Sequence, residues 1–353
     1  MSFFQNHSGW PLVPLKNIAT LKRGYDLPVG VRNEGAVPIY AANGKNGCHD
    51  EIKIEGPGVI TGRSGTIGKV HYCDEAFWPL NTSLYVMDFH GNHPRWVYYM
   101  LSVFKLERFS EGAGVPTLNR NLVHDEVIPL PLLPEQKRIA AILDKADAIR
   151  RKRQQAIQLA DDFICAVFLD MFGDPNSNPK RADLLPMTEV FEIKTGKLNS
   201  NAAIDGGEYP FFTCAKEVFA IDSFAFDQEA LLLAGNNAQA DYDVKYYKGR
   251  FNAYQRTYVL TLRDSGWSYP FYKFALQYQL SNLKRASKGS NTKYITLEIM
   301  ERTMLPVPSQ GEQKRFVEYF DQVQAVQAAL LVQAQNDEKL FSALSYKAFS
   351  GQL

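Results

Sequence analysis

Short apolar runs separated by Gly, Asn and Pro fill most of the chain, and each series of runs is followed by a long stretch of helical periodicity. Runs rich in β-branched and aromatic residues lie at 37–47, 56–72 and 229–262. Such runs, bounded by turn-forming residues, predict β-strands joined by tight loops. Helical spacing occurs later in each region, around Trp96–Leu106 and Phe271–Leu283. The pattern predicts the α+β class, with a sheet first and helices packed after it.

The first long helical stretch covers residues 135–172. It follows the stop signals Pro131 and Pro134, and Gly173 and Pro175 end it. At about 1.5 Å per residue, this helix would be roughly 57 Å long. A second stretch within residues 310–353 repeats the same plan.

Each long helix carries one apolar stripe that a lone helix cannot bury. The simplest solution is that the two helices pair as a coiled coil. The alternative is that each stripe packs on its own domain. The positions predicted to pair are Ile139, Ile142, Leu143, Ile149, Ile157, Ile164, Phe168, Phe316, Phe320, Val323, Val326, Leu330, Leu340, Phe341 and Leu344.

The chain contains an internal duplication. Residues 135–138 and 312–315 both read EQKR, at an offset of 177 residues, whereas Pro38-Ile39-Tyr40 matches Pro210-Phe211-Phe212 at an offset of 172. Offsets that rise in order along the chain are typical of a duplication with insertions in surface loops, because chance matches would scatter. We therefore expect a domain at 1–130, a helix at 131–175, a second domain at 176–309 and a second helix at 310–353. Residues 1–13 could extend the first domain or pack near the end of the chain.

Composition is typical of a globular protein. The chain of 353 residues is 45% hydrophobic and 22% charged, with a net charge of +1. The start has no positively charged region followed by an apolar core, so it does not resemble a signal peptide. Four cysteines without a CxxC pair give no reason to expect a disulfide framework, and we expect a cytoplasmic protein. A protein that coats nucleic acid by charge alone would be far more basic.

The segment from Pro129 to Pro175, with its EQKRI junction, resembles the conserved spacer of type I restriction-modification specificity (S) subunits. The junction recurs as MLPVPSQGEQKRF at 304–316, and VITGRSGTIGKVHY at 59–72 resembles part of that family's recognition domains. The second domain departs from the family pattern here, because its corresponding stretch LLLAGNNAQADYDV lacks the glycine pattern. The resemblance covers nearly the whole chain.

The resemblance implies two similar α/β target-recognition domains separated by two long antiparallel helices. Each domain would read one half of a split, asymmetric target in double-stranded DNA, and the helices would set the spacing between the halves. Two modification (methyltransferase) subunits and restriction/translocase subunits would be the partners, with no membrane. S-adenosylmethionine, ATP and Mg would then bind to the partner subunits, and this chain would bind no cofactor and catalyse nothing. The expected location is the prokaryotic cytoplasm.

Candidate DNA contacts are polar residues in Gly- and Asn-rich loops. Arg pairs with guanine and Asn or Gln with adenine in the usual bidentate contacts, whereas most Lys would position the protein on phosphates. The first-domain candidates are Lys22, Arg23, Lys45, Arg63, Ser64, Lys69 and Arg120. The second-domain candidates are Lys194, Lys197, Asn236, Asn237, Gln239, Lys245, Lys248, Arg250 and Arg256.

Other motifs favour no catalytic or metal site. The segment Gly62–Lys69 has the wrong spacing for a nucleotide phosphate loop, which also needs Ser or Thr after the Lys. The ExK triplets at 51–53 and 192–194 lack the further acid of a nuclease metal site. The pairs Cys48-His49 and His71/Cys73 follow no familiar zinc spacing. A nuclease or methyltransferase acting alone, and a two-armed adaptor that binds protein, are the rival hypotheses.

The basic run Arg150–Arg153 has two interpretations. It could be a solvated helix face, or it could face DNA that crosses the spacer. We favour the solvated face, with Asp161 and Asp162 of a partner helix as candidate counter-charges.

Overall fold

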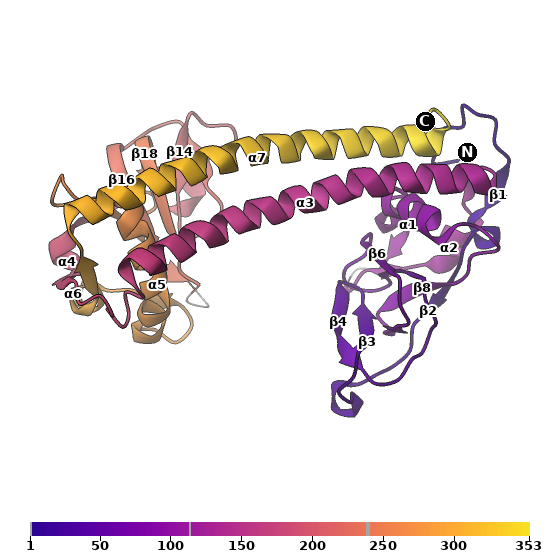
Figure 1. Cartoon of the computed structure of the whole chain (residues 1–353), viewed down its shortest axis with the longest axis horizontal. Coiled ribbons are helices and arrows are strands. Elements are labelled where there is room, and N and C mark those ends of the chain that lie inside the picture. Colours follow the sequence, from indigo (N-terminus) through magenta and orange to yellow (C-terminus); the bar gives the residue numbers. More distant parts are fainter. Residues whose placement is uncertain (1, 113, 238–240) are drawn as a thin grey trace. The chain divides into compact units, whose positions relative to one another are not determined.

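The computed structural model describes residues 2–112, 114–237 and 241–353. The chain forms two compact units, one from residues 1–154 with 332–353 and the other from residues 155–331. The boundary falls inside both long helices, α3 (Leu133–Phe172) and α7 (Gln310–Ser350), so each unit holds a domain and half of each helix (Figure 1). The ranges expected from the sequence place the domain boundaries at the ends of the long helices. The contacts between residues instead group each half of a long helix with one domain. Within the described ranges, none of the helices combines the length and apolar character of a membrane span.

The first unit is built on two sheets, a four-stranded antiparallel sheet and a three-stranded mixed sheet (Figure 1). One has the order β2-β8-β5-β6 and the other the order β4-β3-β7. The strands of these sheets are β2 (Thr20–Arg23), β3 (Val37–Ala41), β4 (Gly44–His49), β5 (Gly58–Gly62), β6 (Val70–Cys73), β7 (Trp78–Pro79) and β8 (Ser83–Asp88). Two short pairs join β1 (Leu12–Pro14) to β11 (Val127–Pro129) and β9 (Ser110–Glu111) to β10 (Thr117–Leu118). The helices are α1 (Pro94–Val103) and α2 (Arg120–Asp125), with 3-10 turns at Leu15–Asn17, Val29–Val31 and Leu106–Phe109.

The second unit contains a six-stranded sheet in the order β13-β19-β16-β18-β14-β15. Its strands are β13 (Phe191–Thr195), β14 (Tyr209–Phe212), β15 (Phe219–Ile221), β16 (Phe226–Ala234), β18 (Val244–Ala253) and β19 (Thr257–Leu262). Two short pairs join β12 (Asp183–Pro186) to β21 (Met304–Val307) and β17 (Asn236–Asn237) to β20 (Lys293–Tyr294). The helices are α4 (Met187–Val190), α5 (Tyr269–Ala286) and α6 (Leu297–Arg302), with a 3-10 turn at Ser200–Ala202.

The strand pairing repeats between the two units, which confirms the duplication. In the first unit, β3 pairs parallel to β7 through Ile39 and Trp78; in the second, β14 pairs parallel to β18 through Phe211 and Asn252. Gly24 and Gly196 occupy the same place. A Cβ on Gly24 would lie 2.2 Å from the Leu80 carbonyl oxygen, and one on Gly196 would lie 1.7 Å from that of Ala253. The predicted α+β class is therefore confirmed, with α1 and α5 at the predicted helical stretches.

The two long helices run antiparallel within each unit. In the first unit, Arg150 and Arg153 of α3 form ion pairs with Glu338 and Asp337 of α7 at 2.8 and 3.1 Å. In the second unit, Gln327 of α7 donates to Asp161 of α3 at 2.7 Å. The two expectations for the apolar stripe are both met in part, because the buried positions touch the partner helix and also enter the core of a domain. Ile139 and Leu143 belong to the first core; Ile164, Phe168, Phe316, Phe320 and Val323 belong to the second.

Three predicted pairing positions are wrong. Ile149, Val326 and Leu340 are 49%, 55% and 53% exposed. The physical reason is that ion pairs and amide hydrogen bonds join the middle parts of the helices, so apolar side chains there do not form a continuous seam. Ile142, Ile157, Leu330, Phe341 and Leu344 are half-buried.

Residues 2–14 meet both expectations from the sequence, because this segment extends the first domain and also packs near the end of the chain. Strand β1 pairs with β11 of the first domain. The segment before it packs on the end of α7, where the His7 amide donates to the Ser350 carbonyl at 2.8 Å and the Phe4 ring lies 5.4 Å from that of Phe349.

Candidate nucleic-acid interface

Three arginines of the first domain converge on one cavity of about 400 Å³. Arg23 ends β2, Arg63 follows β5, and Arg120 begins α2. The backbone fixes this arrangement. The Leu118 amide donates to the Arg63 carbonyl at 2.7 Å, which holds the segment before α2 against the end of β5. We call this cavity the arginine pocket; Leu84, Glu111, Thr117, Leu118, Asn119 and Asn121 complete its lining.

The arginines in this pocket are neutralised only in part. Arg23 lies 3.6 Å from Asp26, with both side chains largely exposed. Arg63 donates through Nη1 to the Asn81 carbonyl at 3.1 Å. Arg120 is exposed, and its guanidinium makes no hydrogen bond or ion pair with any other residue in the described ranges. Guanidinium groups in such a pocket can bind the guanine edge or a phosphate.

The other first-domain candidates lie outside this pocket. Lys22 precedes Arg23 on β2 and is exposed, and Ser64 pairs with Thr117 at the rim of the pocket. Lys45 lies on β4, in the other sheet of the unit, where it too is exposed.

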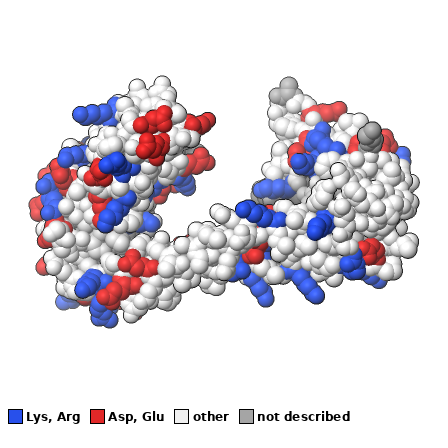
Figure 2. Space-filling model, turned by 90° about the horizontal axis from the view of Figure 1, so that it is seen from above, with Lys and Arg blue, Asp and Glu red and all other residues white. Residues whose placement is uncertain are grey.

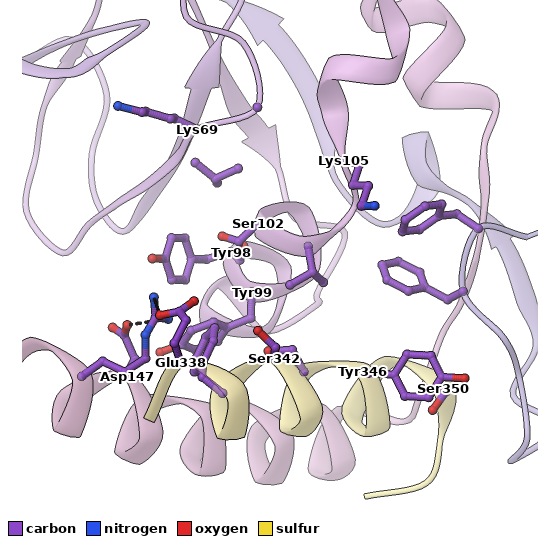
Figure 3. Close-up of a pocket in the computed structure, with 18 of the residues that line it drawn as sticks. Lys69, Tyr98, Tyr99, Ser102, Lys105, Asp147, Glu338, Ser342, Tyr346 and Ser350 are labelled. Carbon is purple, nitrogen blue, oxygen red and sulfur yellow. Dashed lines mark hydrogen bonds and ion pairs between the residues drawn. The ribbon is translucent and has the colours of Figure 1, made fainter. Parts of the chain in front are cut away.

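Lys69 lines a different cavity of about 810 Å³ within the first unit (Figure 3). Tyr98, Tyr99 and Ser102 of α1 face this cavity together with Ser342 and Tyr346 of α7, and Lys69 lies at one edge (Figure 3). Ser345, which also lines it, is buried and its hydroxyl makes no hydrogen bond within the described residues. Burial lowers the pKa of the nearby His71 imidazole. The basic loop residues predicted in the first domain therefore do not form one surface: Arg23, Arg63 and Arg120 share a pocket, whereas Lys45 and Lys69 lie elsewhere.

In the second domain, Asn236 and Arg256 line a cavity of about 500 Å³. We call it the asparagine pocket. Asn236 follows the end of β16, and Arg256 lies in the turn before β19. Lys194 and Lys197 line a neighbouring cavity of about 800 Å³ that shares Thr195, Tyr258 and Leu297 with it.

Three cationic candidates on β18 are already engaged by acids. Lys248 lies 3.4 Å from Glu229 and Arg250 lies 3.1 Å from Asp227. The hydrogen bond to Asp227 raises the pKa of the Arg250 guanidinium. The Lys245 side chain is only 15% exposed, and its amine contacts Asp243 at 2.7 Å and the Ala215 carbonyl at 2.8 Å. This geometry does not favour Lys245 as a DNA contact.

Asn237 and Gln239 are the two remaining second-domain candidates. Asn237 donates through Nδ2 to the Asp241 carbonyl at 3.2 Å and pairs with Lys293 across β17 and β20. Gln239 lies outside the described residues.

Comparison with known proteins identifies the family. The family model for the type I restriction modification DNA specificity domain matches twice, at residues 7–159 and 182–338. The chain belongs to this family.

Individual relatives agree with this membership. The chain is 36% identical to the Escherichia coli type I restriction enzyme EcoDI specificity subunit over 171 residues, which span 47% of this chain and 37% of that relative. The chain thus spans little more than a third of that relative's length. Its fold is similar to that of the type I restriction-modification S subunit from M. genitalium, with a TM-score of 0.65 and 15% identity over 98% of this chain and 97% of that one. A chain from a type I R-M system complex gives a TM-score of 0.51 at 17% identity, covering 99% and 100%.

In this specificity-domain chain, the glycine-rich segment Gly62–Lys69 joins two antiparallel strands, β5 and β6. A nucleotide phosphate loop instead leads from a strand into a helix. The segment is therefore a strand connection, in which Gly65 and Gly68 take positive φ of 82° and 92°.

The residues of the other motifs that were considered for catalysis or metal binding make contacts within the fold. Lys194 lies 2.9 Å from Glu192 and lowers the pKa of that carboxyl. Lys53 lies over the Trp78 ring at 4.8 Å. His49 is buried and accepts a hydrogen bond from the Asn33 amide at 3.2 Å. Among the described residues, no group of three or more His, Cys, Asp or Glu side chains could hold a metal ion.

The basic run Arg150–Arg153 is directed at acids of the helix pair. Arg150 and Arg153 bind Glu338 and Asp337, and Arg151 lies 3.3 Å from Asp147 of its own helix. The expectation that Asp161 and Asp162 answer this run is wrong, because the antiparallel register places residues 337 and 338 there instead.

Several lining residues were missed by reasoning from the sequence. Asn119 accepts from the Asn121 amide at 3.1 Å as the N-cap of α2, and Thr296 caps α6 in the same way at 3.3 Å from the Ile299 amide. The duplication itself carried this signal, because Asn119 and Thr296 stand at the same offset of 177 as the two EQKR sequences.

Proposed function

We propose that this chain is the DNA-specificity subunit of a type I restriction-modification enzyme. Each domain reads one half of a split, asymmetric double-stranded target, and the chain itself is not catalytic. The observation that carries the proposal is the duplication: two domains of one fold, each with a cavity formed at the same junction of elements. Fixed recognition domains joined by a rigid element determine half-site spacing in other DNA readers, and the long helices would do so here.

Two modification subunits are the proposed partners on the helices, joined by restriction/translocase subunits. Part of α3 in the second unit supports such docking. Leu159 and Phe163 are 66% and 53% exposed and, four residues apart, lie on one helix face. Exposed apolar faces of this kind are typical of protein contact sites. S-adenosylmethionine, ATP and Mg would be held by these partners and not by this chain, and the assembly would work in the prokaryotic cytoplasm.

Co-expression with a modification subunit from a neighbouring gene tests the proposal. Single-molecule sequencing should then find methylated adenines in one split motif, and the motif should vanish when this chain is omitted. Methylation that does not depend on this chain, or a product without a split motif, would contradict the proposal. The purified chain, incubated with DNA, Mg²⁺ and labelled S-adenosylmethionine, should give no turnover. Turnover would favour a nuclease or methyltransferase acting alone.

A further inference from the structure

The arginine pocket and the asparagine pocket occupy equivalent places in the two domains. Each lies where the first strand of the sheet ends beside its neighbour. Arg23 pairs with Leu84 across β2 and β8, and Thr195 pairs with Tyr258 across β13 and β19. All of these residues line the respective pockets.

The second wall of each pocket is also equivalent. In the first domain, the segment before α2 hydrogen-bonds to the residue after β5, from the Leu118 amide to the Arg63 carbonyl at 2.7 Å. In the second, the segment before α6 hydrogen-bonds to the end of β16, from the Ile295 amide to the Gly235 carbonyl at 2.9 Å. The two cavities are also similar in volume, about 400 and 500 Å³.

The chemistry of the two pockets differs although their geometry is the same. None of the three arginines of the first pocket has an arginine at its equivalent position. Thr195 stands in place of Arg23, Gly235 in place of Arg63, and Leu297 in place of Arg120. Asn236 is the equivalent of Ser64, because Ser64 pairs with Thr117 as Asn236 pairs with Tyr294. Arg256 is the guanidinium that lines the second pocket.

Equivalent positions with different side chains indicate that the pockets contact bases and not phosphates. Both halves of a duplex target have the same sugar-phosphate backbone, so a phosphate contact gives no reason to replace Arg by Thr, Gly or Leu at an equivalent position. Base edges differ between the two halves of an asymmetric target. A pocket of fixed geometry and changed chemistry is what two different base pairs require.

We infer that these two pockets are where each domain reads a base of its half-site. The inference rests on the proposed function and adds the identity of the bases. The arginine pocket takes a guanine, whose O6 and N7 accept from a guanidinium, with Arg120 as the free donor. The asparagine pocket takes an adenine, whose N6 and N7 match the Asn236 amide.

Substitutions at the free arginine test the inference in the complete methyltransferase complex. Arg120→Ala and Arg120→Lys should both relax one G·C position in one half of the methylated motif, because Lys keeps the charge but loses the paired donors. Asn236→Ala should relax an A·T position in the other half. Lys180→Ala, at an exposed position outside both pockets and outside the candidate DNA contacts, is the control and should leave the motif unchanged.

Equilibrium binding separates base reading from general weakening. The complex is titrated with target duplexes that carry each single base-pair change. Arg120→Ala should weaken binding to the correct duplex about 5- to 150-fold, and should then show no further loss on the duplex changed at its G·C position. This cycle also decides the matter if the variants abolish methylation altogether. Arg120 is exposed, so thermal unfolding should not change.

The outcomes distinguish this inference from the proposed function. If the unaltered chain directs no split motif, the proposed function fails. If it directs a split motif but Arg120→Ala weakens every duplex equally, the side chain is a phosphate contact and the inference alone is wrong. The inference is also wrong if Arg120 and Asn236 affect the same half, or if the relaxed position is not G·C for Arg120.

Discussion

At the scale of single residues, each copy of the EQKR sequence contains a buried glutamine that connects two helices by hydrogen bonds. Gln136 accepts from the His93 amide at 2.9 Å and donates to the Pro131 carbonyl at 3.0 Å. Gln313 repeats both bonds, from the Ser268 amide at 2.9 Å and to the Pro308 carbonyl at 3.0 Å. His93 and Ser268 are the N-cap residues of α1 and α5. Each glutamine therefore ties a long helix to the first turn of a domain helix.

Replacing this glutamine should destabilise the unit that contains it. Gln313 is 0% exposed, so Gln313→Ala would leave the Ser268 amide and the Pro308 carbonyl without a buried partner. We expect a loss of about 1–3 kcal/mol in the free energy of unfolding, measured by urea denaturation. The control Gln322→Ala, at an exposed position of the same helix, should change stability by less than about 0.5 kcal/mol. Equal effects of the two substitutions would contradict the role assigned to Gln313.

Residue identity predicted the members of the candidate site better than their arrangement. Arg23, Arg63 and Arg120 were all expected as DNA contacts, but nothing in their spacing showed that they share one pocket. Their meeting depends on the backbone bond from the Leu118 amide to the Arg63 carbonyl, a tertiary contact that no local pattern encodes. For the same reason, the sequence could not show that Lys245 is held by Asp243.

At the scale of elements, the long helices combine apolar ends with a polar centre. Their buried residues near the helix ends serve the domain cores, as Phe168 does when its ring lies 5.5 Å from those of Tyr278 and Phe316. Periodicity correctly predicted both helices and most buried positions. It could not distinguish Leu143, which meets a domain, from Ile149, which does not, because both fall on one stripe.

The two faces of α3 should respond differently to the same substitution. Phe168→Ala removes a fully buried ring and should cost about 3–5 kcal/mol of unfolding free energy. Phe163→Ala, five residues earlier and half exposed, should cost much less. Urea denaturation of both variants measures the difference. A similar loss for both would mean that the exposed face of the helix is covered in solution.

The exposed face of α3 should be needed for assembly and not for folding. Leu159→Ser and Phe163→Ser replace exposed apolar side chains with a small polar one, so an interface core would lose apolar burial. We expect reduced co-purification with the modification subunit while the unfolding free energy of the chain stays nearly constant. Gln155→Ser, an exposed polar position on the same helix, serves as the control. Unchanged co-purification for both apolar variants would place the docking surface elsewhere.

At the scale of the whole molecule, the duplication and the balance of charges together affect how the chain would bind DNA. Basic and acidic side chains are interspersed on the surface in the view of Figure 2, in keeping with the net charge of +1 (Figure 2). A net charge this close to zero gives only a weak long-range attraction to DNA. Base contacts in two pockets can supply specificity without much affinity, provided that partner subunits neutralise most of the phosphates.

This division of labour predicts the salt dependence of binding. The logarithm of the binding constant falls with the logarithm of salt concentration by about 0.9 for each phosphate neutralised, so the chain alone should show a shallow slope and the complex a steeper one. Lys45 is exposed and makes no ion pair with another described residue, so Lys45→Ala should reduce the slope of the complex by about one. Lys248 is paired with Glu229 at 3.4 Å, so Lys248→Ala should reduce it less. Fluorescence anisotropy with a target duplex over a series of salt concentrations measures these slopes. If no salt-dependent complex forms even with the modification subunit present, the chain is a two-armed adaptor that binds protein. A protein that binds the duplex through its phosphates must displace counterions, so its binding depends on the salt concentration.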